Sequence, residues 1–398
     1  MRKVGKLEGW KVERLGDVCE IFNGGTPDTK VPKFWGGDIL WITPKDMGKL
    51  ESIYVDDTAR KITDAGMKNS SAKILPVNSV ILSSRAPIGH LAINTKEITT
   101  NQGCKGIVPK KELSTLFLYY FLENSVELLN NLGSGTTFKE LSGSKLAEVQ
   151  IPIPPLPEQQ RIVSVLDEAF ASIVQAKSNA ERNLVNAREL FDATLQEIFT
   201  KRGKGWEDKT VGDVSTHSLG KMLDKQKNRG NFQKYLRNIN VRWFDFDLSD
   251  VGEMRFLDDE KEKYTAIKGD LLICEGGYPG RAAIWQEDYP IFFQKAIHRV
   301  RFHKPEYTKW FLYFLYLSDI NGNLKKYLTG TGIQHFTGQA LDRFVLPIAP
   351  LAEQRAIVGR LEALSAETGR LEEIYQRKVE SLEELKRSVL GKAFEGEL

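Results

Sequence analysis

The stretch Ile151-Pro-Ile-Pro-Pro-Leu-Pro-Glu158-Gln159 decides the fold, because it returns as Leu346-Pro-Ile-Ala-Pro-Leu-Ala-Glu353-Gln354, 195 residues further along. A second marker precedes each copy at nearly the same spacing. Gly9-Trp10, followed by Leu15-Gly16-Asp17-Val18, returns as Gly205-Trp206, followed by Val211-Gly212-Asp213-Val214. Two markers repeated at nearly one spacing within 398 residues predict a complete internal duplication.

A duplication of this size predicts two similar modules related by a local two-fold axis. Duplex DNA is the commonest partner with matching pseudo-symmetry. The net charge of +3 is too small to indicate a nucleic-acid binder by itself, so any basic surface must be local.

Composition indicates an ordinary soluble globular protein. Hydrophobic residues make up 41% and charged residues 27%, and no run approaches the ~20 apolar residues of a membrane span. The basic start is followed by a charged stretch, which is not typical of a signal peptide. The cysteines are scattered and odd in number, so we expect reduced packing residues in a cytoplasmic protein. They are Cys19, Cys104 and Cys274.

Each proline-rich marker is followed by a heptad-like apolar pattern. Such patterns predict two helices of about 40 residues, roughly 60 Å long, packed along a seam as a coiled coil. Two separate amphipathic helices are the alternative, although so long a stripe exceeds what one globular domain usually covers. The first seam comprises Leu166, Phe170, Ile173, Ala180, Leu184, Ala187, Phe191 and Ile198, with Lys177 and Thr194 as weaker members. The second comprises Leu361, Leu364, Leu371, Tyr375, Leu382, Leu385 and Val389, with Thr368 and Lys378 as weaker members.

The remaining sequence predicts two mixed domains. In the first we expect strands over 38–42, 79–83 and 104–108 and a helix over 116–132. In the second we expect strands over 235–239, 270–274 and 297–301 and a helix over 310–328. The predicted fold class is α+β, with two globular mixed α/β domains separated by two long antiparallel helices packed as a coiled coil, and internal pseudo-two-fold symmetry. The predicted segments are 1–150 and 206–345 for the domains, and 151–205 and 346–398 for the helical spacers.

The sequence contains no recognisable catalytic constellation. Gly133-Ser-Gly135-Thr-Thr lacks the lysine of a phosphate-binding loop, and neither HExxH nor a zinc-ligand spacing is present. The motif by which adenine methyltransferases hold the target base is absent too. Carboxylates near Asp245 and Asp250 are interpreted as a solvated loop. This pattern indicates a recognition protein that is not an enzyme and binds no metal.

Each half instead carries polar and basic residues on strand ends and glycine-rich turns. Arginine can contact guanine, asparagine and glutamine can contact adenine, and lysine can contact guanine or phosphate. The alternatives are exposed strand ends, simple β-turns and a helix C-cap. Candidate DNA-binding residues of the first half are Thr43, Lys45, Ser84, Arg85, Gln102, Lys105, Ser134 and Thr136. Those of the second half are Arg237, Asn238, Asn240, Arg242, Tyr278, Arg281, Gln294, Lys295, Thr331, Gln334 and His335.

Three of these stretches suggest pairings between the halves. The turn 83–89 is paired with the stretch 275–281, so that the motifs end at Gly89 and Gly280, and Gln102 is paired with Gln294. The loop 133–138 is paired with 330–336, glycine for glycine, so Gly133 matches Gly330.

With its two Pro-Leu-Glu-Gln-type markers, the chain resembles the DNA-specificity subunits of type I restriction-modification systems over nearly its whole length. Ala349 and Ala352 depart from the proline-rich form. Base-reading positions of the family are too variable to be transferred residue by residue.

The resemblance implies a non-catalytic subunit that reads an asymmetric bipartite site on double-stranded DNA, one half-site per domain. The helices would set the gap and dock two methyltransferase subunits, with restriction subunits joining the full complex. S-adenosylmethionine, ATP and Mg are implied on those partners and none on this chain. The alternatives are a coiled-coil scaffold whose domains bind proteins, and the recognition fragment of a fused restriction-methylation enzyme.

Overall fold

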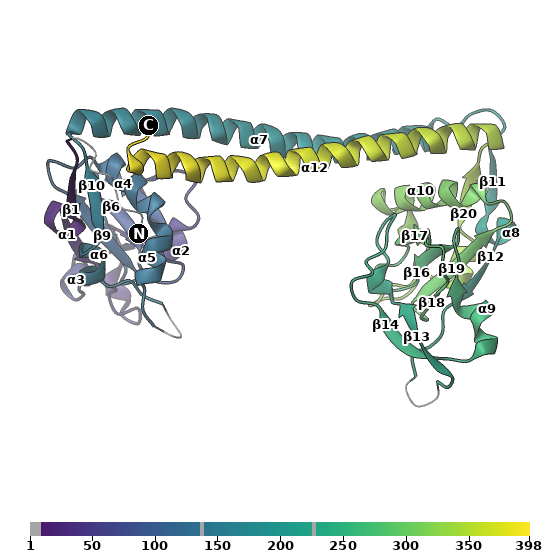
Figure 1. Ribbon diagram of the computed structural model, residues 1–398. Coiled ribbons are helices and arrows are strands. Elements are labelled where there is room, and N and C mark those ends of the chain that lie inside the picture. Colours follow the sequence, from purple (N-terminus) through teal and green to yellow (C-terminus); the bar gives the residue numbers. More distant parts are fainter. Residues whose placement is uncertain (1–8, 136–138, 225–227) are drawn as a thin grey trace. The chain divides into compact units, whose positions relative to one another are not determined.

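A computed structural model describes residues 9–135, 139–224 and 228–398, which form two compact units (Figure 1). The first unit extends to Glu181 and also contains Arg377–Leu398, and the second is Arg182–Gln376. Each unit combines one globular domain with part of two 45-residue helices, α7 (Leu156–Thr200) and α12 (Leu351–Glu395). The four predicted segments divide the chain in sequence order, whereas packing joins each domain to parts of both long helices.

The globular domain of the first unit contains two small sheets. One has the order β2-β9-β6-β7-β4 and is antiparallel except for β4 with β7, and the other has the order β5-β3-β8. Its strands are β2 (Cys19–Asn23), β3 (Trp35–Ile42), β4 (Tyr54–Val55), β5 (Arg60–Ile62), β6 (Val80–Ser83), β7 (Leu91–Asn94), β8 (Thr99–Thr100) and β9 (Cys104–Pro109). Its helices are α1 (Leu15–Val18), α2 (Pro44–Met47), α3 (Asp64–Lys68), α4 (Thr115–Asn124), α5 (Val126–Leu132) and α6 (Gly143–Ala147).

The second unit repeats this plan with sheets ordered β12-β19-β16-β17 and β14-β13-β18-β15. Its strands are β12 (Ser215–Leu219), β13 (Asn231–Leu236), β14 (Gly252–Phe256), β15 (Thr265–Ala266), β16 (Leu271–Cys274), β17 (Ala282–Ile284), β18 (Ile291–Phe293) and β19 (Ile297–Phe302). Its helices are α8 (Val211–Val214), α9 (Lys261–Tyr264), α10 (Glu306–Ile320) and α11 (Gly338–Asp342). The parallel pair β3–β8 returns as β13–β18, so the repeat extends to the way the strands pair.

A two-stranded antiparallel ribbon joins each domain to its long helix. β1 (Lys11–Arg14) pairs with β10 (Gln150–Ile153), and β11 (Glu207–Thr210) pairs with β20 (Val345–Ile348). Pro152 and Pro347 lie within β10 and β20. Pro154, Pro155 and Pro350 follow these strands, and their fixed φ holds the backbone extended until α7 or α12 begins.

Both cores centre on a helix that is apolar on most sides. Phe117 to Leu122 of α4 are all buried, and α10 likewise buries Trp310 and Phe311 completely. Such helices must be covered over most of their surface. Sheets cover part of the surface, and residues of α7 and α12 belong to the same apolar clusters. At ~1.5–3 kcal/mol for each large side chain buried, these clusters fasten the long helices to the domains.

The two long helices pack against each other within each unit, as the heptads predicted. Lys177 forms an ion pair with Glu383 in the first unit, and Arg188 Nε lies 2.8 Å from Glu372 Oε2 in the second. Two predicted seam residues are wrong, because Leu385 is 48% exposed and the weaker member Lys378 is exposed too. The sequence analysis also missed buried residues that leave the seam for the cores, namely Leu195, Phe199, Leu390, Ala393 and Phe394.

The predicted strands are confirmed, but three element ends were misplaced. The predicted helix 116–132 is broken at Ser125, which separates α4 from α5. α10 ends at Ile320, and a 3-10 turn, Asn323–Tyr327, follows Gly322 with its φ of 75°. β13 ends at Leu236, so the predicted strand 235–239 runs instead into a 3-10 turn.

The three cysteines are free and buried, as predicted for reduced packing residues. Burial raises the pKa of Cys19 and Cys104 to about 12 and that of Cys274 to about 11. In the part of the chain that the structure describes, no helix is long and apolar enough to cross a membrane.

Candidate nucleic-acid interface

Backbone hydrogen bonds bring the polar stretches of the first unit together. Ser84 N–H, in the turn after β6, donates to Gly103 O (2.7 Å), and Ser84 O accepts from Leu141 N–H (2.8 Å). Asn101 N–H donates to Ile42 O at the end of β3 (3.0 Å). We call residues 43–46, 84–89, 101–105, 134–135 and 139–141 the first loop cluster.

The second unit has the same arrangement. Glu275 N–H donates to Ala296 O, and Glu275 O accepts from Phe336 N–H, both at 2.8 Å. Gln294 N–H donates to Leu236 O at the end of β13 (3.1 Å). We call residues 237–242, 275–281, 294–298 and 329–336 the second loop cluster. Stretches that the sequence singled out separately are therefore neighbours within each unit.

Backbone hydrogen bonds give the register of the two arginine turns, which ends them at Gly89 and Gly280 as the sequence predicted. Gly89 and Gly280, both with positive φ, donate their N–H groups to the last residue of the preceding strand (3.1 and 2.9 Å). By that register, Arg85 has Gly276 as its counterpart. Arg85 and Arg281 thus occupy different places in otherwise equivalent turns.

The glutamine pairing shifts by one residue. Gln294 and Asn101 make the equivalent backbone hydrogen bond, so Asn101 rather than Gln102 is the counterpart of Gln294. By the same register, buried Lys105 on β9 corresponds to buried His298 on β19.

The pairing of the glycine loops shifts by two residues. Each loop is closed by an isolated β-bridge, Ser134 with Glu140 and Thr329 with His335. In each loop the first bridging residue is followed by a glycine of positive φ, Gly135 (120°) or Gly330 (106°). Gly330 therefore matches Gly135 rather than Gly133. Glu140 and His335 are then equivalent.

The strand-end motifs hold the backbone turns together. Thr43 caps α2 in a capping box with Asp46, whose Oδ2 accepts from Thr43 N–H (3.0 Å). Asn240 takes the place of Asp46, accepting from Arg237 N–H (2.8 Å). Asn240 is 2% exposed and donates to two further carbonyls, which leaves it no free polar atom for DNA. Lys45 is exposed.

Two side chains of the first cluster have partners on its surface. Arg85 Nε lies 3.1 Å from Glu140 Oε2, with about two fifths of each side chain exposed. Gln102 is exposed and hydrogen-bonded to the Thr26 hydroxyl. Ser84 is fully buried, and its Oγ has no partner among the described residues.

Lys105 and Ser134 line one cavity of about 770 Å³. Burial lowers the pKa of Lys105 from its ordinary value, although only 5% of the residue is exposed and it still reaches the cavity. Ser134 is exposed. Thr136 lies outside the described residues.

The arginines after β13 are bound to carboxylates. Arg237 lies 2.7 Å from Asp250 and Arg242 lies 3.2 Å from Asp247. The acidic loop interpreted as solvated thus neutralises these arginines. Either arginine would have to exchange a carboxylate for a base or phosphate to contact DNA.

Arg281 and Tyr278 are tied to neighbouring segments. Arg281 donates to Asn238 O (3.0 Å), and its Nε is buried without a partner among the described residues. Asn238 in turn donates to Gly276 O (3.1 Å). The Tyr278 hydroxyl donates to Asp319 Oδ2 (3.0 Å), and the Arg281 guanidinium lies 5.2 Å from its ring centroid.

Three candidates of the second cluster share a second cavity, of about 490 Å³. Gln294, Lys295 and His335 line it together with Glu275. Lys295 is exposed, and so are the other two loop candidates, Thr331 and Gln334.

The sequence analysis missed Glu140 and His298. His298 is 1% exposed, and its burial lowers its pKa to about 4. Its Nε2 atom lies 3.0 Å from Phe336 O. Its ring lies 5.8 Å from that of His217. Correct alignment of the halves would have placed both Glu140 and His298 at candidate positions, but that alignment requires the strand register.

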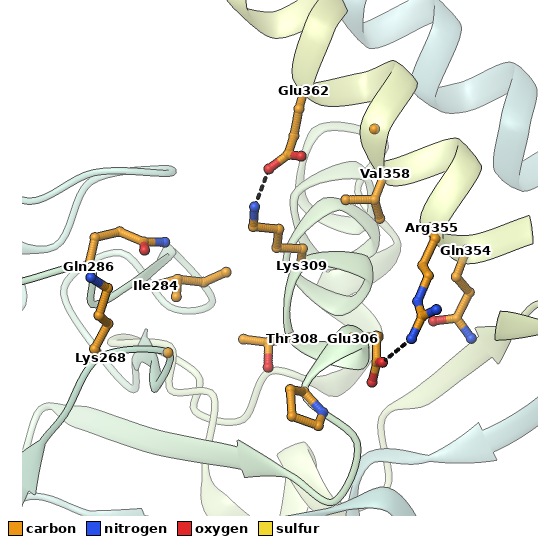
Figure 2. A pocket seen from close by; sticks show the side chains of 13 residues that line it. Lys268, Ile284, Gln286, Glu306, Thr308, Lys309, Gln354, Arg355, Val358 and Glu362 are labelled. Atoms are coloured by element: carbon orange, nitrogen blue, oxygen red, sulfur yellow. Dashed lines mark hydrogen bonds and ion pairs between the residues drawn. The ribbon is translucent and has the colours of Figure 1, made fainter. Parts of the chain in front are cut away.

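A further cavity of the second unit, about 380 Å³, lies between the starts of α10 and α12 (Figure 2). Ion pairs flank it, Lys309 with Glu362 and Arg355 with Glu306, the latter at 2.7 Å. Gln354 of the second marker also lines it, and the Oε1 atom of this residue is buried without a partner among the described residues.

No group of three or more His, Cys, Asp or Glu residues suited to a metal ion occurs among the described residues. The clusters offer hydrogen-bond donors, acceptors and paired charges, which is the chemistry of nucleic-acid recognition.

A family model described as "type I restriction modification DNA specificity domain" matches residues 7–182 and 203–380. The MjaIX specificity subunit of Methanocaldococcus jannaschii is 38% identical over 229 residues, 53% of each chain, so the match spans about half of that relative. The EcoKI specificity subunit of Escherichia coli K12 is 24% identical over 99% of this chain and 90% of its own.

Solved structures share the fold. A chain from work on complex assembly and conformational transition of the type I R-M system has a TM-score of 0.77 at 19% identity, over 98% of this chain and 99% of that one. The HsdS subunit from Thermoanaerobacter tengcongensis has a TM-score of 0.63 at 19% identity, over 98% and 97%. The family model matches both halves of the repeated fold. The chain therefore belongs to the type I restriction modification DNA specificity domain family.

Proposed function

We propose that this chain is the DNA-specificity subunit of a type I restriction-modification complex. Each of its two domains would read one half of an asymmetric bipartite site on double-stranded DNA, and the long helices would set the gap. The observation that carries the proposal is the pair of loop clusters. The same arrangement of backbone hydrogen bonds occurs in both units but carries different side chains at equivalent positions. Arg85 of the first unit corresponds to Gly276 of the second, and Glu140 corresponds to His335.

Such a subunit would perform no chemistry. Two methyltransferase subunits would dock on the helices and supply S-adenosylmethionine chemistry, and restriction subunits with ATP and Mg would join them in the cytoplasm. The helix pairs support docking, because α7 and α12 leave apolar residues exposed, including Val174, Val185 and Ile374.

Methylation mapping tests the proposal. The chain is co-expressed with the methyltransferase subunit encoded beside it in a host without DNA methylation, and the genome is sequenced for modified adenines. We expect one two-part motif with a fixed gap. Expression of the methyltransferase alone is the control and should leave that motif unmodified.

Exchanging side chains of one loop cluster sharpens the test. Arg85→Ala should weaken binding or alter the methylated sequence in one half of the motif and leave the other half unchanged. A stable complex that modifies no DNA would instead favour a coiled-coil scaffold whose domains bind proteins.

A further inference from the structure

The first loop cluster contains a buried cation that no acceptor in the described chain meets. Lys105 is 5% exposed and pairs in register with Asn23 across β9 and β2. The described residues provide no ion pair and no hydrogen bond to its ammonium group. Glu140, which acts on Lys105 electrostatically, is itself paired with Arg85 at 3.1 Å. Because burial of the residue lowers the pKa of Lys105, a counter-charge from outside the chain that enters the cavity would stabilise its charged form.

The cavity around Lys105 is lined by polar residues, among them Ser134, Ser142, Ser144 and Asn23, and no aromatic residue is among the described residues that line it. The hydroxyl oxygens of Ser142 and Ser144 lie 3.0 Å apart, so one of these hydroxyls already donates to the other. With Glu140 neutralised by Arg85, Lys105 gives the wall one net positive charge. This set suits an oxyanion and offers no flat ring on which a base could stack.

The second unit fills the equivalent place with its own side chains. His298 corresponds to Lys105, and His217 of β12 corresponds to Ile21 of β2. The His217 ring packs against that of His298 and lies 2.8 Å from Asp342 Oδ1. His298 is closed off by its contact with Phe336 O. An anion site at this position is therefore a property of the first unit alone.

We propose that the cavity around Lys105 binds one phosphate group of the DNA backbone in the half-site of the first unit. The inference rests on the proposed function and deepens it. Lys105 supplies the charge, and Ser134 and Ser144 supply hydroxyl donors. The contact fixes the register of one half-site on its domain without reading a base.

The test compares the wild-type chain with Lys105→Met, in complex with the methyltransferase subunit, on a duplex carrying the mapped motif. Each phosphate contact contributes about 0.9 to the slope of log affinity against log salt concentration. We expect Lys105→Met to lower that slope by about one and to weaken all sequences alike, roughly tenfold at low salt. The matched control is Lys96→Met, which removes an exposed lysine of the same domain outside the cluster and should retain the wild-type slope.

A DNA-independent readout uses the chain alone. Replacing chloride by inorganic phosphate at equal ionic strength should raise the melting temperature of the wild type and not that of Lys105→Met. In chloride the variant should melt no lower than the wild type, because it loses a charge that burial of the residue disfavours and that has no partner among the described residues. A lower melting temperature in chloride would show a structural lysine and overturn the proposal.

The outcomes separate this inference from the proposed function. DNA binding with a wild-type slope in Lys105→Met overturns the phosphate site and leaves the proposed function intact. A loss confined to particular base pairs at unchanged slope identifies a base contact and also overturns it. A wild-type complex that binds no DNA rejects both the proposed function and DNA as the source of the phosphate, even if inorganic phosphate still stabilises the chain.

Discussion

Replacing Gln159 by leucine should destabilise the first unit by about 2–4 kcal/mol. Gln159 is fully buried, its Oε1 accepts from Ser114 N–H (2.8 Å), and its Nε2 donates to Glu112 O and Pro154 O (both 2.9 Å). Each bond is worth about 1 kcal/mol net, and leucine would leave backbone partners unsatisfied at further cost. The repeated glutamine therefore ties the start of α7 to the start of α4.

The equivalent Gln354→Leu should change the stability of the second unit by less than about 1 kcal/mol. Gln354 makes one bond, from Nε2 to Ala349 O (2.7 Å), while its Oε1 is buried without a partner among the described residues. Leucine removes that bond and also removes an unsatisfied oxygen, so the two effects offset each other.

Hydrogen exchange followed by mass spectrometry can measure both variants in the intact chain. Amides of α4 report on the first unit and amides of α10 on the second, and each variant serves as the control for the other unit. Equal losses in the two variants, or a larger loss for Gln354→Leu, would refute the reasoning from hydrogen-bond partners.

Three further predictions follow from the loop clusters and the cores. Arg85→Ala should reduce DNA affinity without changing hydrogen exchange, whereas Arg281→Ala should also raise exchange in the turn 275–281, because Arg281 holds Asn238 O. Burial depresses the pKa of His298 to about 4 in the folded chain, below its ordinary 6.5, so unfolding takes up a proton. The free energy of unfolding is therefore unaffected above pH 6.5 and falls as the pH drops towards 4, by about 2 kcal/mol at pH 5. Urea unfolding of His298→Gln should show a weaker pH dependence than that of the wild type. The native cysteines should resist iodoacetamide at pH 8 and react in denaturant, as read by mass spectrometry; fast native labelling would contradict their burial.

The parts of the fold that depend on local pattern could be predicted from the sequence. Proline-rich markers and apolar periodicity act over a few residues, so the duplication, both long helices and the central strands are confirmed. Leu385 shows where the pattern stops being sufficient. A strict heptad drifts by about 20° per repeat against a straight helix, and the C-terminal end of α12 turns Leu390 and Phe394 into the first core instead.

The equivalence of the two loop clusters could not be predicted, because it depends on strand register. The sequence aligned like residues, such as Gln102 with Gln294, whereas backbone pairing aligns Asn101 with Gln294. A shift of one residue in a strand changes every neighbour, and register is fixed by contacts distant in the sequence. The candidate stretches lie together within each unit, but the partners of their side chains, such as Glu140 for Arg85, could not be predicted.

The paired ribbons β1–β10 and β11–β20 make each recognition domain a closed cassette. Its first and last strands are hydrogen-bonded neighbours, with Lys11 opposite Ile153 and Glu207 opposite Ile348. Insertions, deletions or wholesale replacement between those strands therefore leave the start of the following helix where it was. Under the proposed function, recombination at the ribbons would give a lineage a new half-site in one step, while the helices proposed to dock its partners stay the same.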